Sequence, residues 1–91
     1  MNIDKKIISF LYEAVELESR EITGVDIIHE FSNYSRGYVF DRTQVLKSNR
    51  YISSTQRRSR FLKLTDKGKK WAIEIEEEKE RKNNGTKSVS S

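Results

Sequence analysis

The residues of this chain best suited to binding a ligand are basic and lie in one segment, Ser35–Lys70. Eleven Lys and Arg residues stand there against two acids, a formal charge of +9, while the residues before it sum to −4 and those after it to −1. A polyanion facing the segment would account for this placement, because Lys and Arg neutralise phosphate charge. A solvated basic face without a ligand is the alternative. We favour the polyanion, because the charge coincides with one predicted structural unit.

Residues that perform catalysis or hold metals are scarce. The chain has one His, His29, and no Cys, which excludes disulfides and thiolate metal sites. There is no Gly-rich phosphate loop and no pair of carboxylates at a catalytic spacing. The acids of residues 74–80 lie on a predicted helix surface with no sign of the desolvation that is typical of catalytic acids. We therefore expect no catalytic residue, no metal, no cofactor and no enzymatic activity.

The length of 91 residues accommodates one domain. We expect this domain to occupy residues 1–81 and to be followed by a disordered polar tail, residues 82–91, because the sequence NNGTKSVSS has the composition of unfolded segments. No apolar run reaches the ~18–20 residues of a membrane span. Acids interrupt the apolar pattern of the first residues, unlike in a signal peptide. A cytoplasmic protein without membrane contact is expected.

Apolar spacing predicts the elements that position the basic residues. A first helix is expected over Asp4–Ser19, and helical spacing predicts its inner face. That face consists of Ile3, Ile7, Leu11, Ala14 and Val15 and is widened by Ile8. Residues 20–22 suit either a connector or an edge strand. Thr23 and Asp26 then suit a capping box for a helix over residues 24–31. Its inward residues are expected to be Val25, Ile28 and Phe31.

The basic segment itself is predicted to begin with a helix over Arg36–Ser48, whose inner face is Val39, Thr43 and Leu46. Two strands follow, at residues 51–55 and 60–64, joined by a turn over residues 56–59. Thr65 is the expected N-cap of a last helix that runs to about residue 81. Gly68 within that helix predicts a close contact with a neighbouring element, because glycine is otherwise costly there.

Some apolar residues fall off these inner faces. They are Phe10 and Leu17 on the first helix and Ile73 on the last. They suit either a broader buried stripe or a second apolar surface, and we name them as a candidate dimer interface.

The order of these elements resembles the winged helix-turn-helix DNA-binding domain of small microbial regulators of the PadR and MarR type. Three features over about residues 3–80 carry the resemblance. One is the series Val39, Leu46 and Tyr51-Ile52, which is similar to a recognition helix entering a wing. Another is Phe61–Gly68, FLKLTDKG, which is similar to the end of the wing, and the last is the aromatic-bearing helix that follows it.

The chain departs from the family at three places, one of which is the predicted wing turn, residues 56–59, which has no Gly. Arg50 stands where a Gly usually precedes the first wing strand, so we expect Asn49 to take the left-handed backbone conformation instead. Thr43 stands where Leu is common.

The resemblance implies an α+β, mainly α fold with a three-helix core, a two- to three-stranded wing sheet and a C-terminal helix. It also implies a recognition helix, residues 36–48, in the major groove and a basic wing, residues 56–60, on the DNA backbone or in the minor groove. Gln44 would pair with adenine, and Arg36 or Arg42 would contact guanine or phosphate. The implied DNA-binding residues are Arg36, Tyr38, Asp41, Arg42, Gln44, Lys47, Ser48, Gln56, Arg57, Arg58, Arg60 and Lys63.

These observations favour a sequence-specific double-stranded DNA-binding protein, dimeric through its first and last helices, that regulates transcription at the nucleoid. A DNA-organising protein for plasmid partition, replication control or nucleoid coating would use the same surface with less base readout. A winged helix that contacts only proteins is a further alternative, although the basic segment argues against it.

Overall fold

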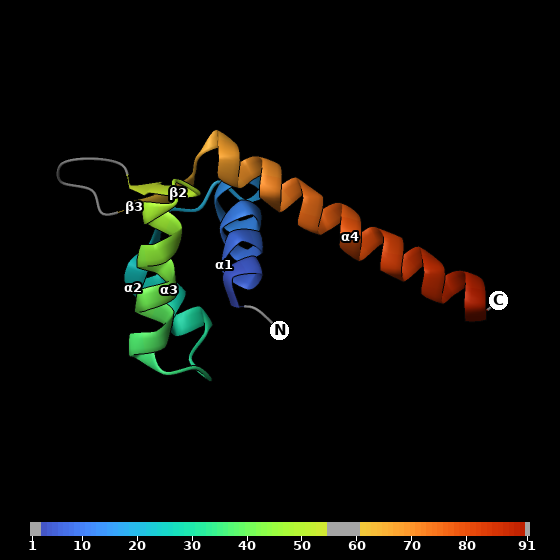
Figure 1. Ribbon diagram of the computed structural model, residues 1–91, viewed down its shortest axis with the longest axis horizontal. Helices are drawn as coiled ribbons and strands as arrows, with labels where there is room; N and C mark the ends of the chain where they lie inside the picture. Colours follow the sequence, from blue (N-terminus) through green and yellow to red (C-terminus); the bar gives the residue numbers. More distant parts are fainter. Residues whose placement is uncertain (1–2, 55–60, 91) are drawn as a thin grey trace.

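The computed structural model describes residues 3–54 and 61–90, with side chains as far as residue 80. The elements in chain order are α1 (Ile3–Leu11), the π-helix η1 (Tyr12–Leu17), β1 (Ile22–Thr23), α2 (Gly24–Glu30), α3 (Arg36–Ser48), β2 (Ile52–Ser54), β3 (Phe61–Leu64) and α4 (Asp66–Ser90). The described residues form an α+β fold that is mainly helical, in agreement with the predicted fold class (Figure 1).

The strands of the described residues form one antiparallel sheet in the order β1-β3-β2, so that β3 is central. Ile22 of β1 lies opposite Leu62, and Ile52 of β2 lies opposite Leu64. All four side chains are buried, because alternate residues of a strand share one face of the sheet. Of the two alternatives for residues 20–22, the edge strand is therefore the one observed, beginning at Ile22.

Helix α1 lies between α3 and α4 and packs against both (Figure 1). Its predicted inner face is confirmed, because Ile3, Ile7 and Leu11 are fully buried, together with Ile8. Burying one such side chain contributes about 1.5–3 kcal/mol. This one helix therefore supplies a large part of the core that holds α3 in place.

The first helix does not continue regularly to Ser19. From Tyr12 it becomes the wider η1, in which the N–H of Glu18 donates to the carbonyl oxygen of Glu13 at 3.0 Å, a bond spanning five residues. The N–H of Arg20 then donates to Ala14 at 2.7 Å. Ser19 adopts a left-handed φ of 56° and ends the helix without a glycine. The chain leaves this turn to enter β1.

Helix α2 begins with the predicted capping box. The hydroxyl of Thr23 accepts from the N–H of Asp26 at 3.2 Å, and the Asp26 carboxylate accepts from the N–H of Thr23 at 2.9 Å. The predicted inner face is wrong at Val25, which is 57% exposed, whereas Ile27 is fully buried. Ile27 and Phe31, four residues apart, share the face of α2 that packs into the core.

Polar groups join α1 to α4. The hydroxyl of Ser9, which is buried, donates to Glu76 at 3.2 Å and accepts from Lys79 at 3.1 Å. The Lys5 ammonium lies 3.6 Å from the Glu78 carboxylate. The acidic run of the last helix is thus not only a solvated face, because part of it holds α1.

Helix α4 projects away from the rest of the fold toward the C-terminus (Figure 1). Its backbone is helical as far as Ser90, beyond the predicted end near residue 81. The disordered tail over residues 82–91 stays a prediction. Within residues 3–54 and 61–90, no helix combines the length and apolar character needed to cross a bilayer.

Candidate nucleic-acid interface

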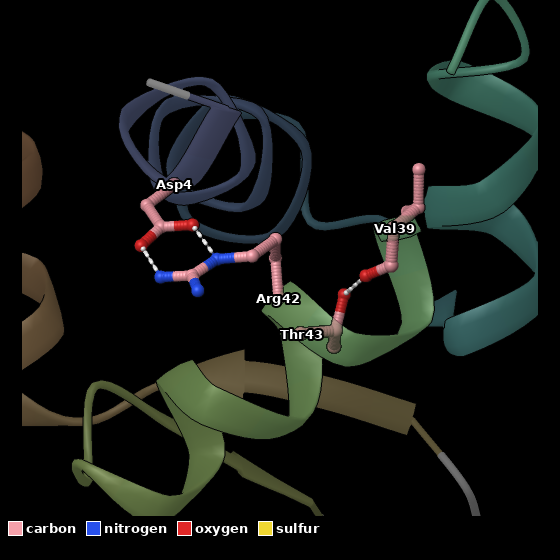
Figure 2. Close-up of polar contacts among 4 residues, drawn as sticks. All are labelled: Asp4, Val39, Arg42 and Thr43. Carbon is pink, nitrogen blue, oxygen red and sulfur yellow. Dashed lines mark hydrogen bonds and ion pairs between the residues drawn. The ribbon is translucent and has the colours of Figure 1, made fainter. Parts of the chain in front are cut away.

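Helix α3 spans the predicted residues 36–48, and its local sequence explains both its start and its orientation. The hydroxyl of Ser35 accepts from the N–H of Tyr38 at 3.2 Å and caps the first turn. Val39, Thr43 and Leu46 are buried, as their spacing predicted. The Thr43 hydroxyl, in the place where the family commonly has Leu, donates to the carbonyl oxygen of Val39 at 2.8 Å (Figure 2). A buried polar group is thereby satisfied within the helix.

The opposite face of α3 is turned away from the core. Tyr38, Asp41 and Ser48 are exposed, and Gln44 and Lys47 are half-buried. Arg36 is exposed in the first turn. The structure therefore places most of the predicted contact residues of α3 on an accessible surface.

Arg42 is the exception among the predicted contact residues of α3. Its guanidinium reaches α1 and forms a bidentate pair with Asp4, with Nε donating to Oδ1 at 2.8 Å and Nη2 donating to Oδ2 (Figure 2). The bonds to the Asp4 carboxylate raise the pKa of Arg42, and Asp4 is itself buried. This pair assigns Arg42 to the packing of α3 on α1, a role that the sequence analysis did not anticipate.

The end of α3 is built differently from the expectation. Asn49 has an ordinary φ of −86°, and Arg50 instead takes the left-handed conformation, with φ of 66°. The N–H of Arg50 donates to the carbonyl oxygen of Lys47, and the N–H of Tyr51 donates to the carbonyl oxygen of Leu46, both at 3.0 Å. These bonds satisfy the last carbonyls of the helix. Arg50 thus adopts the kind of backbone that the family's glycine suits, and the prediction for Asn49 is wrong.

The start of α4 holds this turn in place. Thr65 caps α4 as predicted, because its hydroxyl accepts from the N–H of Gly68 at 3.0 Å. The same hydroxyl donates to the carbonyl oxygen of Arg50, and the N–H of Thr65 donates to Tyr51 at 3.0 Å. The Lys67 ammonium donates to the carbonyl oxygen of Asn49 at 3.1 Å. The LTDKG motif therefore fixes the exit of α3, and its glycine makes the close contact that its position predicted.

Lys67 and Lys70 are two further basic residues that are candidates for contacts with a nucleic acid. Neither was among the predicted site residues. They line an open groove of about 370 Å³ together with Tyr51, Trp71 and Glu74. The rings of Tyr51 and Trp71 lie 4.7 Å apart, and the Lys67 ammonium lies 4.5 Å from the Tyr51 ring centre. The sequence signals for them were their membership of the basic segment and, for Lys67, its place in the LTDKG motif. Trp71 packs against the core.

A series of aromatic rings leads from α1 to the first turn of α3. Phe10 packs edge-on against Phe31 at 6.0 Å, Phe31 lies 6.3 Å from Tyr34, and Tyr34 lies 6.0 Å from Tyr38. Phe10, named above as a candidate dimer residue, is therefore half-buried inside one chain. The rings tie the orientation of the first turn of α3 to the core.

The other two candidate dimer residues, Leu17 and Ile73, are exposed. The Lys69 ammonium lies 3.6 Å from the Glu16 carboxylate, and this ion pair joins η1 to α4. These are the two segments that carry Leu17 and Ile73.

The remaining predicted residues fall in or beside the hairpin. Lys63 is exposed on β3, opposite Ser53 of β2. Gln56, Arg57, Arg58 and Arg60 lie outside the described residues. Among the residues that the structure describes, no group of His, Asp and Glu side chains is arranged to hold a metal ion.

Comparison of the chain with protein-family models, with curated proteins and with solved structures finds no match. The assignment of the fold to the winged-helix family therefore stays a prediction. The observations that bear on function are the geometry of α3 and the charge around it.

Proposed function

We propose that this chain is a winged helix-turn-helix protein that binds double-stranded DNA in a sequence-specific manner and regulates transcription as a dimer. One observation carries the proposal. The helix that opens the +9 segment is sealed against the core on one side and presents polar and aromatic side chains to solvent on the other. An exposed helix of this kind fits the major groove, which is wide enough to admit an α-helix.

The arrangement of elements supports the winged-helix part of the proposal. Helices α2 and α3 pack on each other and are joined by a short turn, and the β2–β3 pair follows α3 directly. The fixed turn at Arg50 connects α3 rigidly to β2. The resemblance implies that residues 56–60, which include three arginines, contact the phosphate backbone when α3 lies in the groove.

The exposed apolar side chains of Leu17 and Ile73 support the dimer. They lie on η1 and α4, and the two-fold axis of a dimer formed there would repeat α3 on each side. Two recognition helices on one face suit a pair of half-sites about one helical turn apart.

The proposal is tested by selecting bound duplexes from a random pool and by measuring the mass of the complex. We expect one enriched sequence with two half-sites, two chains per duplex, and affinity that falls steeply with salt. Each neutralised phosphate contributes about −0.9 to the slope of log affinity against log salt. A slope near zero would contradict DNA binding.

A DNA-organising protein would use the same surface, so footprinting separates it from a regulator. Protection of one discrete site supports a regulator. Protection that spreads along the duplex, or that covers arrays of repeats, supports an organising role instead.

A further inference from the structure

The outer face of α3 is more apolar than a solvated helix surface requires. Tyr38 is 45% exposed, Phe40 53% and Val45 37%, although each carries a large apolar side chain. By helical spacing they flank the polar strip of Asp41 and Gln44 on both sides. Isolated exposed apolar residues are ordinary, but three on one helix face indicate a contact surface.

Arginine is the side chain that most often reads guanine, through bidentate bonds to its O6 and N7 atoms. The one arginine in the middle of α3 is Arg42, and its Nε and Nη2 groups are bonded to Asp4. Releasing them would break two hydrogen bonds to a buried carboxylate, which is costly. The central turns of α3 therefore present no free guanidinium to a base pair.

Gly37 leaves open space beside the first turn of α3. A Cβ at this position would meet nothing within 4 Å, so the fold itself does not require glycine there. Glycine within a helix is destabilising by roughly 0.5–1 kcal/mol relative to alanine. By helical spacing Gly37 falls on the same outer face as Asp41 and Gln44, where a missing side chain lets the helix approach a partner.

We propose that α3 reads A·T base pairs, with Gln44 bonding adenine and with Val45 and Phe40 contacting the 5-methyl groups of thymine; this rests on the DNA binding proposed above. Glutamine is complementary to the N6 and N7 atoms of adenine, and apolar side chains contact the thymine methyl. The segment carries a charge of +9, so the partner of complementary charge is a nucleic acid and not an apolar protein surface.

The test compares three duplex probes of about two helical turns. The first contains only A·T pairs in mixed order, the second has deoxyuridine at every thymidine position, and the third has G·C pairs in place of all A·T pairs. The deoxyuridine probe removes only the methyl groups and leaves the protein and the hydrogen-bonding atoms unchanged. Dissociation constants are measured by fluorescence anisotropy at one salt concentration and again at a higher one.

We expect binding to the A·T probe to be about tenfold tighter than to the G·C probe, the range of one good base contact. Deoxyuridine should weaken binding several-fold. Val45→Ala should reduce the difference between the thymidine and deoxyuridine probes, and Val45→Ala combined with Phe40→Ala should abolish it. The matched control Val25→Ala, at an exposed valine on α2, should leave that difference intact.

Equal, salt-dependent binding to all three probes would overturn the A·T readout alone and leave DNA binding standing. Binding that distinguishes A·T from G·C but ignores the methyl groups would overturn the role of Val45 and Phe40. Absence of salt-dependent binding to every probe would overturn the proposed function together with this inference.

Discussion

Gly68 of α4 lies against the carbonyl oxygen of Tyr51, so closely that a Cβ at Gly68 would stand 2.1 Å from that oxygen. The backbone is held in place at both Gly68 and Tyr51. Tyr51 follows the left-handed turn at Arg50, and Gly68 belongs to the turn capped by Thr65. The exit of α3 and the start of α4 are therefore one rigid joint.

Gly68→Ala is accordingly expected to destabilise the fold by about 1–3 kcal/mol, the usual cost of forcing extra atoms into packed structure. Denaturant unfolding followed by circular dichroism measures the change. Gly24→Ala is the matched control, because a Cβ at Gly24 would meet nothing within 4 Å. Equal free energies of unfolding for the two variants would show that the backbone around Gly68 shifts at little cost to accommodate the added methyl group.

Gly37→Ala should have the opposite sign. Because a Cβ there meets no neighbour, the substitution should raise the free energy of unfolding by up to about 1 kcal/mol. It should lower affinity for the selected duplex, because the added methyl group lies on the proposed contact face. Unfolding curves and anisotropy titrations of the same sample measure both effects. A gain in stability with unchanged affinity would place Gly37 outside the interface.

Arg42 and Arg36 should separate structural from binding roles. Arg42→Lys cannot reproduce the bidentate pair with Asp4, so we expect a lower unfolding midpoint and an unchanged salt slope of DNA binding. Arg36→Lys is the control for the same exchange at an exposed position and should leave the midpoint unchanged. Arg42→Gln, which removes the charge, should also leave the salt slope unchanged, and a slope reduced by about one unit would mean that Arg42 leaves Asp4 and contacts phosphate when DNA binds.

The capping box of α2 predicts one part of the acid response. The bond from the N–H of Thr23 lowers the pKa of the Asp26 carboxyl below its ordinary value of 3.8, with a further contribution from the Thr23 hydroxyl. Because the folded-state pKa is the lower one, this stabilisation is present above the unfolded-state value and is lost as pH falls through the folded-state value. Asp26→Asn should therefore reduce the dependence of stability on pH in the region below about 4, and leave the dependence at higher pH unchanged. Unfolding curves of both proteins across that region measure it.

Arg57→Ala combined with Arg58→Ala should weaken binding to every duplex and reduce the salt slope by about two. Gln44→Ala should instead relax the preference for adenine, with a salt slope that stays the same. The measurement is affinity for the selected duplex and for an unrelated one across a salt series. If both variants change affinity equally on all sequences, the division of roles between α3 and residues 56–60 is wrong.

Local chemistry allowed several elements to be predicted from the sequence. The spacing of Val39, Thr43 and Leu46 defined the buried side of α3, since side chains three and four apart share a helix face. The caps at Thr23 and Thr65 were readable for the same reason, since each bonds a backbone N–H only three residues away. The concentration of basic residues around α3 is also a property of the sequence alone.

Contacts between distant residues were decided by the tertiary structure. Arg42 was a plausible groove contact until the packing of α3 on α1 brought it to Asp4, 38 residues away in the chain. The left-handed Arg50 and the inward turn of Ile27 in place of Val25 likewise depend on neighbouring elements. A periodic pattern determines which side of a helix is apolar, because that depends on nearby residues. It does not determine which partner meets a polar side chain, because that depends on how the helices pack.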